Sequence, residues 1–310
     1  MKTISEIRKL SELPAPHHLA IGVFDGVHLG HRAVIKEALR SARNDGGSAV
    51  VVTFDPHPSR VLFPDNPRRL LASTEHKTRL VESMGVAGLL VIPFDKAFSE
   101  KSADDFVAEL VEGSGALTTI CVGHDWQFGA KREGDVSLLK NLAAEKGFSV
   151  VAVDPVVSDN GEAVSSTRIR SAIQNGDFAT AEGLLGRDYT VLGRVIEGDR
   201  LGGKIGFPTA NLTVFNEELP PNGVYAVEAN LEGTLVKGVG NLGVRPTINE
   251  PDAHRRLEIH LFNFADDIYG KLLEVFFRGF IRPEMKFDGI ESLKAQIGKD
   301  AEEARRILEC

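Results

Sequence analysis

Short apolar runs alternate with amphipathic stretches through the first half of the chain. The apolar runs predict strands at residues 18–24, 48–54, 88–93, 118–122 and 149–153. The stretches between and after them predict helices at residues 30–44, 74–84, 102–113, 135–147 and 167–185. Strands that alternate with helices are typical of a parallel sheet, and uninterrupted apolar runs indicate strands buried on both faces. The first half is therefore predicted to be an α/β domain.

From about Tyr189 the pattern changes to short runs separated by Gly, Pro, Asn and Asp. This texture is typical of antiparallel strands in a small barrel. It predicts two hairpins, one around Glu232-Gly233 and one joining residues 255–264 to residues 271–281. A helical pattern returns from Gly289 to Leu308. We expect two domains, residues 1–186 and 187–310, because 310 residues exceed what one hydrophobic core usually holds.

Composition limits the classes of partner. The chain is 42% hydrophobic and 26% charged, as in ordinary globular proteins, and its net charge of −8 provides no basic surface for nucleic acid. Its N-terminus has no uninterrupted apolar stretch, and Cys121 and Cys310 lack the spacing of metal ligands. We expect a cytoplasmic protein, monomeric or weakly homo-oligomeric, without a membrane or nucleic-acid partner.

The segment GVFDGVHLGH, from Gly22 to His31, joins the first predicted strand to the first predicted helix. Ligands of open α/β sheets bind at this edge, and glycines and free helix amides suit an anion. Imidazoles at His28 and His31 can donate to a phosphate and offset charge in a transition state. The segment predicts nucleotidyl transfer. A zinc site, or a loop with two exposed histidines, is the alternative.

Three other segments of this half lie near predicted strand or helix ends. SSTRIR, from Ser165 to Arg170, is either a second anion site or a helix start with hydroxyl caps. FDPHP and GHDWQFG follow the second and fourth strands, so His57 and Asp125 are candidates for substrate contact. For His57 a turn position is an equal alternative, and for Trp126 and Phe128 core packing is favoured over stacking on a ligand.

The barrel half has its own glycine-rich segment, GDRLGGKIGFPTAN, from Gly198 to Asn211. It either wraps phosphates or forms a surface hairpin, and it lacks the Gly-Lys-Ser/Thr end of a Walker A loop. Thr209 and Asn211, two residues apart on extended backbone, offer oxygen ligands to Mg²⁺. Glu258 and His260 alternate with apolar residues in LEIHLF, and a carboxylate at Glu258 can accept a hydroxyl proton in phosphoryl transfer.

In their order along the whole chain, these motifs resemble the bacterial bifunctional riboflavin kinase/FAD synthetase family. GVFDGVHLGH, FDPHP, GHDWQFG and SSTRIR resemble its adenylyltransferase module. IGFPTAN, NLGVRPT (241–247), LEIHLF, YGK (269–271) and IRPEMKF (281–287) resemble its kinase module. The resemblance implies a Rossmann-like nucleotidyltransferase domain followed by a riboflavin kinase barrel, with ATP as co-substrate, Mg²⁺ as cofactor, and riboflavin, FMN and FAD as ligands.

The resemblance also implies roles for individual residues. FMN phosphate would attack ATP, with His28 and His31 stabilising the transition state and Glu258 acting as the base on riboflavin. The adenylyltransferase would bind nucleotide through Gly22, Phe24, Asp25, Gly26, Gly30, Ser166, Thr167, Arg168 and Arg170, and flavin through His57, Asp125 and Phe128. The kinase would bind nucleotide through Gly202, Lys204, Gly206, Pro208, Thr209 and Asn211, metal through Thr209 and Asn211, and flavin through Arg282 and Phe287.

Three positions depart from the family pattern: Trp126 replaces phenylalanine, Gln127 replaces arginine, and Gly203-Lys204 replaces a glycine followed by arginine. Lys204 keeps the charge of that arginine without its two-pronged geometry. Two other functions stay open: nucleotidyl transfer to another acceptor, such as pantetheine phosphate or nicotinamide mononucleotide, and a flavin sensor or carrier without turnover. The barrel half argues against the former, and the intact candidate residues argue against the latter.

Overall fold

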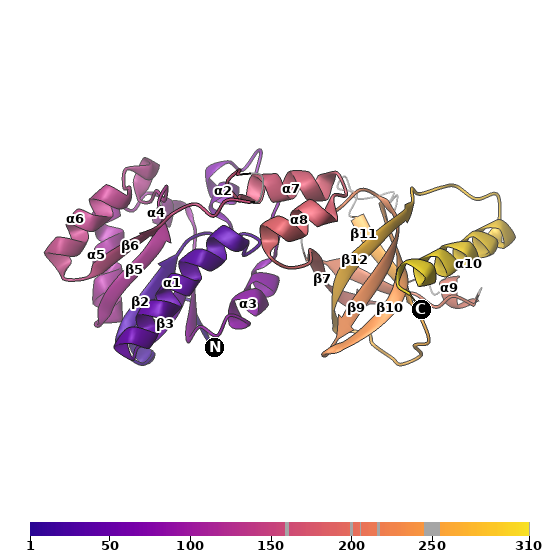
Figure 1. Ribbon diagram of the computed structural model, residues 1–310, viewed down its shortest axis with the longest axis horizontal. Coiled ribbons are helices and arrows are strands. Elements are labelled where there is room, and N and C mark those ends of the chain that lie inside the picture. The colour runs from indigo at the N-terminus through magenta and orange to yellow at the C-terminus, as the bar shows by residue number, and fades with distance from the viewer. Residues whose placement is uncertain (159–160, 199–200, 205, 216–217, 245–254, 310) are drawn as a thin grey trace. The chain divides into compact units, whose positions relative to one another are not determined.

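The computed structural model describes residues 1–158, 161–198, 201–204, 206–215, 218–244 and 255–309 (Figure 1). Contacts between Cα atoms divide the chain into two compact units. The first unit comprises Met1–Leu70 and Thr74–Ser166, and the second comprises Leu71–Ser73 and Thr167–Cys310. Within the described residues, no helix has the length and apolar character needed to cross a membrane.

The first unit is built on a six-stranded sheet in which every pair is parallel, in the order β1-β4-β3-β2-β5-β6. The predicted α/β architecture is confirmed. The strands are β1 (Lys2–Ile4), β2 (His17–Ile21), β3 (Ser48–Asp55), β4 (Gly88–Pro93), β5 (Leu117–Gly123) and β6 (Ser149–Val153). The sequence pattern missed β1, because three residues are too few to show a periodicity.

Helices cover both faces of this sheet, as the apolar strands require. In β2, Leu19 and Ile21 join one apolar cluster with η1 and α5, whereas Ala20 joins another with α1 and α3. Alternate side chains of the strand therefore enter opposite cores. The helices are η1 (Ile7–Glu12), α1 (Leu29–Asp45), α2 (Pro58–Leu62), α3 (Thr74–Glu82), α4 (Lys96–Ser99), α5 (Ala103–Ser114), η2 (Ala130–Arg132) and α6 (Val136–Lys146).

The second unit contains the predicted barrel, whose six antiparallel strands close in the order β10-β11-β8-β7-β12-β9. They are β7 (Thr190–Ile196), β8 (Ala210–Val214), β9 (Gly223–Leu231), β10 (Thr234–Val244), β11 (Arg255–Leu261) and β12 (Leu272–Arg282). The short helix α9 (Leu201–Lys204) precedes β8. After β12, α10 (Ile290–Ile307) packs Ala301 and Ala304, together with Leu308 just after its end, on the apolar residues of β9 and β10.

One predicted hairpin is confirmed and the other is wrong. β9 pairs with β10 around Glu232-Gly233, where both residues have positive φ. β11 does not pair with β12: it lies between β10 and β8, and β12 lies between β7 and β9. Closure of the barrel decides this, because β7 and β8 fill the space between the two strands.

The single helix predicted at residues 167–185 is two helices, α7 (Ser166–Gln174) and α8 (Phe178–Leu185). Gly176 has a φ of 72°, and the carboxylate of Asp177 caps α8 by accepting a hydrogen bond from the backbone N–H of Thr180 at 3.0 Å. Phe178 then stacks on Phe277 of the barrel at 5.6 Å. A glycine followed by an aspartate cap thus ended the first helix and began the next.

Candidate functional site

The loop between β2 and α1 has a strained backbone. Phe24 and Val27 have φ values of 52° and 43°, which are rare for residues other than glycine, and Gly26 has a φ of 79°. Both apolar side chains are 2% exposed, so core packing holds the loop in this shape. Strain that surrounding structure maintains is typical of functional loops.

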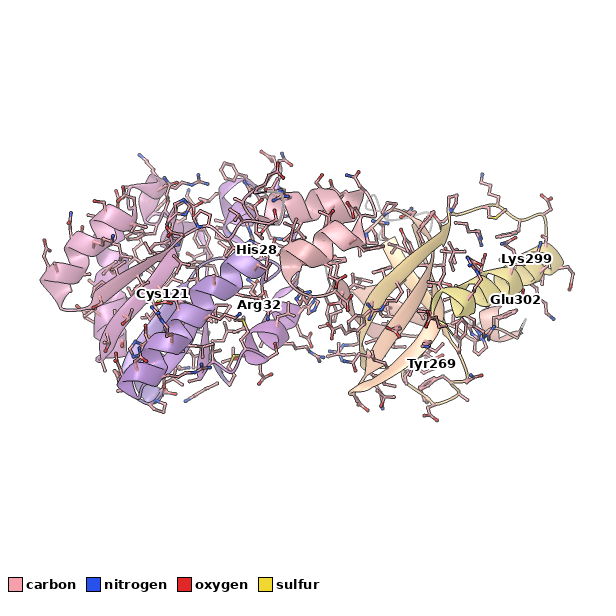
Figure 2. All side chains as sticks on the ribbon, in the orientation of Figure 1. His28, Arg32, Cys121, Tyr269, Lys299 and Glu302 are labelled. Carbon is pink, nitrogen blue, oxygen red and sulfur yellow. The ribbon has the colours of Figure 1, made fainter. Side chains whose placement is uncertain are left out.

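His28 caps the N-terminus of α1 with its own ring (Figure 2). Its Nδ1 accepts a hydrogen bond from the backbone N–H of His31 at 3.3 Å. In the neutral ring, Nε2 therefore carries the proton and is a donor. The His28 and His31 rings stack with centroids 3.5 Å apart and planes at 18°. The structure thus brings the two predicted histidines into direct contact.

The surroundings of His31 disfavour its charged form. Burial, then the neighbouring His28 and then the ammonium group of Lys77 hold the pKa of His31 well below its ordinary value. Phe24 contacts the ring edge-on at 5.4 Å, and Nδ1 of His31 has no hydrogen-bond partner within the described part of the chain. The imidazole is therefore neutral at neutral pH.

Ser166 reaches this loop from the start of α7. Its hydroxyl donates a hydrogen bond to the carbonyl of Asp25 at 3.1 Å. The other predicted pyrophosphate-binding residues, Thr167, Arg168 and Arg170, follow in α7 and belong to the second unit. Ser166, the last residue of the first unit, is therefore bonded to the Gly22–His31 loop of the same unit.

The residues predicted to bind flavin in the first unit differ in exposure. His57 caps α2, where its Nδ1 accepts a hydrogen bond from the backbone N–H of Ser59 at 3.1 Å. The side chain of Asp125 is 83% exposed. Phe128 is 7% exposed and stacks on Trp126 at 4.4 Å. Phe128 is thus a core residue with one ring face against Trp126.

Sequence patterns missed Lys77 and Thr53, which lie beneath the loop. The ammonium group of Lys77 donates hydrogen bonds to the carbonyl of Val23 at 2.9 Å and to the hydroxyl of Thr53 at 3.2 Å. Lys77 is 5% exposed and Thr53 is fully buried. A lysine in an amphipathic helix is normally assigned to the solvent face. The pattern of apolar residues around Lys77 gave no sign that its side chain is buried.

The second unit has a cavity of about 230 Å³ lined by residues of the barrel strands β9 to β12 and of α10. Among its lining residues, the sequence predicted Gly202, Thr209, Glu258, Arg282 and Phe287 as site residues and did not predict Asn241 or Asp300. A second cavity of about 390 Å³ is lined by Pro208, Thr209 and residues of the 264–269 loop, including Tyr269 (Figure 2). Thr209 therefore lines both cavities.

Register places the candidate metal ligands beside the candidate base. Glu258 of β11 lies directly opposite Asn211 of β8, and opposed residues of antiparallel strands share a face. His260, two residues further along β11, bonds the carbonyl of Pro208 through Nδ1 at 2.8 Å. The proline-threonine segment before β8 is thereby fixed to the strand that carries Glu258.

Close approaches explain two glycines in the segment before β8. A Cβ at Gly198 would lie 2.2 Å from the side-chain nitrogen of Asn211, and one at Gly202 would lie 2.3 Å from the carbonyl of Phe207. Gly206 has a φ of 90°. The side chain of Lys204, and residues 245–247 of the NLGVRPT motif, lie outside the described part of the chain.

Arg282 is fixed by the C-terminal helix. Its guanidinium donates two hydrogen bonds to Asp300 of α10, at 2.8 and 2.6 Å, and lies 5.8 Å from the centre of the Phe287 ring. Asp300 is 4% exposed. The predicted flavin residue is thus also the link between β12 and α10.

Together these features define a class. A parallel sheet with a histidine-bearing, glycine-rich loop at its strand ends, followed by a barrel with a carboxylate beside a glycine-rich segment, is the architecture expected of a transferase that handles phosphates at two separate sites. Comparison with known proteins identifies the family. A model described as FAD synthetase matches residues 10–168, and one described as riboflavin kinase matches residues 185–308.

Full-length relatives agree. The bifunctional riboflavin kinase/FMN adenylyltransferase of Escherichia coli (strain K12) is 38% identical over 310 residues, covering 99% of this chain and 98% of the relative. That of Bacillus subtilis (strain 168) is 37% identical over 314 residues, covering 97% and 98%. The chain therefore belongs to the family of bifunctional riboflavin kinase/FMN adenylyltransferases, and the predicted two-activity enzyme is confirmed.

A solved structure shares the whole fold. A protein from Streptococcus pneumoniae, described as a macrolide-efflux protein, superimposes with a TM-score of 0.82 at 30% identity, covering 99% of both chains. That description belongs to the other protein. The family models and the full-length relatives decide the function of this chain.

Proposed function

We propose that residues 1–186 transfer the adenylyl group of ATP to FMN, and that residues 187–310 phosphorylate riboflavin. The observation that carries this assignment is that the FAD synthetase model covers the predicted adenylyltransferase residues except Arg170, and that the riboflavin kinase model covers the predicted kinase residues. The barrel converts ATP and riboflavin to FMN and ADP. The α/β domain converts ATP and FMN to FAD and pyrophosphate.

In adenylyl transfer, a phosphate oxygen of FMN attacks the α-phosphorus of ATP, and the bond to the β-phosphate breaks. The Nε2–H of His28 is oriented as a donor by the helix cap, so it can bond a phosphate oxygen without reorganisation. His31, stacked against it, donates a hydrogen bond from its ring N–H to the phosphoryl oxygens, on which negative charge develops in the transition state. The loop amides and glycines between Gly22 and Gly30 surround the phosphates, and Phe24 and Asp25 fix the shape of the loop.

The remaining predicted residues of this reaction bind its two ends. Ser166 is already bonded to the loop, and Thr167, Arg168 and Arg170 supply a hydroxyl and two cations for the departing pyrophosphate. His57, Asp125 and Phe128 follow strands β3 and β5, whose ends lie on the same edge of the sheet as the loop. We assign FMN to this edge.

In the kinase, Glu258 acts as the general base. It lines the 230 Å³ cavity with Arg282 and Phe287, so we place riboflavin there, with its 5′-hydroxyl toward the carboxylate. Since Thr209 lines both cavities, ATP binds on the other side of it, where Pro208 and the 264–269 loop form the wall. The hydroxyl oxygen then attacks the γ-phosphorus, and ADP leaves.

The donors at this point fit Mg²⁺. Thr209 and Asn211 offer a hydroxyl and an amide oxygen next to Glu258, all hard oxygen ligands. Gly206, where a Cβ would meet nothing within 4 Å, leaves room for phosphates. When bound, Mg²⁺ would neutralise phosphate charge during transfer. The position of Asn211 is fixed by the close approach of Gly198.

One assay tests the whole assignment. The purified chain is incubated with riboflavin, ATP and Mg²⁺, and the flavins are separated by chromatography. We expect His31→Ala to lower FAD formation from supplied FMN at least about a hundredfold and to spare FMN formation. Glu258→Ala should do the reverse. Glu232→Ala, at an exposed hairpin turn, is the control for the second variant.

The outcomes separate the alternatives. Formation of neither FMN nor FAD would contradict the proposal and favour a flavin sensor or carrier. Adenylylation of pantetheine phosphate or nicotinamide mononucleotide in place of FMN would favour another acceptor. Loss of both activities in either variant would contradict two independent sites. A cytoplasmic location, and a monomeric or weakly homo-oligomeric state, stay predictions that fractionation and light scattering can test.

A further inference from the structure

Lys77 contacts the proposed phosphate loop and has no role in the reaction described above. It lies in α3, the helix that follows the 58–73 segment, and its side chain is 5% exposed. Burying an ammonium group costs several kcal/mol unless it gains strong partners, so a lysine at such a position needs an explanation. Among the described residues, its hydrogen-bond partners are the carbonyl of Val23 and the hydroxyl of Thr53.

These partners tie three elements together. The hydroxyl of Thr53, in β3, donates to the same carbonyl of Val23 at 2.9 Å, so two donors converge on one backbone oxygen. Val23 precedes Phe24, whose φ of 52° begins the strained turn. The orientation of the Val23 carbonyl is therefore fixed at the residue before the chain enters the strained loop.

We propose that Lys77 is a positioning residue for adenylyl transfer: its ammonium group fixes the Val23 carbonyl, and through it the loop that presents His28 and His31 to ATP. This inference rests on the proposed roles of the two histidines. It requires no direct contact between Lys77 and substrate. Thr53 shares the function through its hydroxyl.

The charge of Lys77 has a second effect on the same site. The carboxylates that act on Lys77 are Asp25 and Asp55, which oppose the lowering of its pKa by burial. After burial, the neighbouring His28 and Lys77 are the groups that lower the pKa of His31. Lys77 thus helps to keep the His31 imidazole neutral until the phosphates of ATP arrive.

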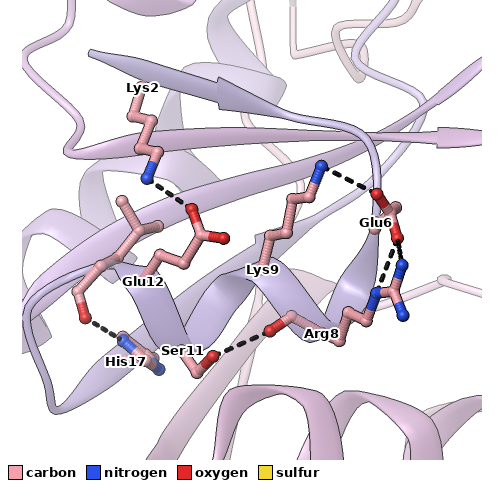
Figure 3. A network of polar contacts seen from close by, with 8 residues as sticks. Lys2, Glu6, Arg8, Lys9, Ser11, Glu12 and His17 are labelled. Atoms are coloured by element: carbon pink, nitrogen blue, oxygen red, sulfur yellow. Dashed lines mark hydrogen bonds and ion pairs between the residues drawn. The ribbon is translucent and has the colours of Figure 1, made fainter.

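Lys77→Met is the informative variant, because methionine keeps the unbranched stem as far as Cε and removes the charged group. The Val23 carbonyl keeps its bond from Thr53, so no buried acceptor is orphaned, and replacing a buried ion with an apolar side chain is often neutral for stability. Lys9→Met is the matched control. Lys9 lies in η1 and forms an ion pair with Glu6, which precedes that helix (Figure 3), and the variant removes the charge of the lysine.

FAD formation from supplied FMN and ATP is measured as kcat and KM, and riboflavin phosphorylation by the same preparation serves as an internal control. We expect Lys77→Met to lower kcat for FAD formation about tenfold to a hundredfold, as loop misplacement does, while phosphorylation and the melting temperature hold. Thr53→Val should lower it less. The double variant should lose less than the product of the two losses, because both act through one carbonyl.

The titration midpoint of His31, followed by NMR, is a second measurement, and a purely structural role of Lys77 would not change it. In Lys77→Met the midpoint of His31 should shift to higher pH, and in Lys9→Met it should not. Unchanged kcat in Lys77→Met, or equal losses of both activities, would overturn the proposal, as would an unmoved His31 midpoint. If Lys77→Met does not fold, the kcat of Thr53→Val decides.

His31→Ala is assayed in parallel to separate the two levels of inference. Retention of FAD formation in His31→Ala would refute the proposed role of the histidines. Loss of it in His31→Ala with full activity in Lys77→Met would refute the role of Lys77 alone.

Discussion

The absence of a side chain at Gly30 leaves space for the ring of His28. Gly30 lies in the first turn of α1, and a Cβ there would meet Cε1 and Nδ1 of His28 at 3.2 and 3.3 Å. Such contacts are tighter than usual, so the ring must move by a few tenths of an ångström. The backbone itself has no need of glycine, because its φ is not positive.

We therefore predict that Gly30→Ala separates stability from function. Alanine in a helix is favoured over glycine by about 0.5–1 kcal/mol, so the melting temperature should hold or rise. FAD formation should fall because the His28 ring is displaced. Steady-state kinetics and thermal unfolding of the same preparation test both parts.

Gly183→Ala is the matched control, because Gly183 lies inside α8 and a Cβ there meets nothing within 4 Å. It should gain similar stability and leave both activities unchanged. Full FAD formation in Gly30→Ala would show that the His28 ring tolerates the displacement.

The lowered pKa of His31 also predicts that the stability of the chain depends on pH. This pKa is lowered in the folded chain, so below the ordinary value of 6.5 the unfolded chain binds a proton that the folded chain does not. The contribution of His31 to the free energy of unfolding is fully present above that pH and declines as the pH falls. We predict that His31→Gln, which cannot titrate, loses less stability than the parent between about pH 7 and about pH 5.

Fluorescence of Trp126, the sole tryptophan, follows unfolding of the first unit in this comparison. His18, whose pKa burial also lowers, is present in both chains and contributes equally. Parallel pH profiles for the two chains would contradict the prediction.

At the scale of elements, α10 matters to the kinase through one ion pair. Asp300→Asn should leave the Arg282 guanidinium without its charged partner in a buried site, which typically costs about 3 kcal/mol. Because Arg282 lines the cavity assigned to riboflavin, we predict a higher KM for riboflavin and a less stable second unit. FAD formation from supplied FMN should be unchanged.

The chain offers an internal probe for this prediction. All three tyrosines, Tyr189, Tyr225 and Tyr269, lie in the second unit, and Trp126 lies in the first. Asp300→Asn should shift the tyrosine transition in urea and leave the tryptophan transition in place. Glu303→Gln, in an exposed pair with Arg306 of the same helix, is the control and should shift neither. Equal shifts of both transitions would show that the units unfold together.

At the scale of the whole molecule, two separate sites predict complementation. His31→Ala should make FMN without FAD, and Glu258→Ala should make FAD only from supplied FMN. A mixture of the two variants, given riboflavin and ATP, should therefore form FAD through FMN released into solution. Accumulation of FMN without FAD in the mixture, with each variant active alone, would contradict free exchange between the sites.

Much of the fold was predictable because its signals are local. Apolar runs marked five of the six strands of the sheet, and the helix predicted at residues 102–113 is α5, Ala103–Ser114. The partner of each strand was less predictable. The wrong hairpin between β11 and β12 followed from their nearness in sequence, whereas closure of the barrel inserts two earlier strands. The sequence shows a glycine at position 176, but the helical pattern on both sides of it predicted one continuous helix.

The sequence by itself determined the two kinds of domain, the family and the candidate site residues, because hydrophobic periodicity and motif order are written along the chain. Only the tertiary structure decided which of these residues meet: that His28 caps α1 and stacks on His31, that Thr209 lines two cavities, and that Lys77 is buried under the loop. Burial and contact depend on segments that lie far apart in sequence. For that reason a lysine that looks like a surface residue in its own helix became a candidate part of the site at Gly22–His31.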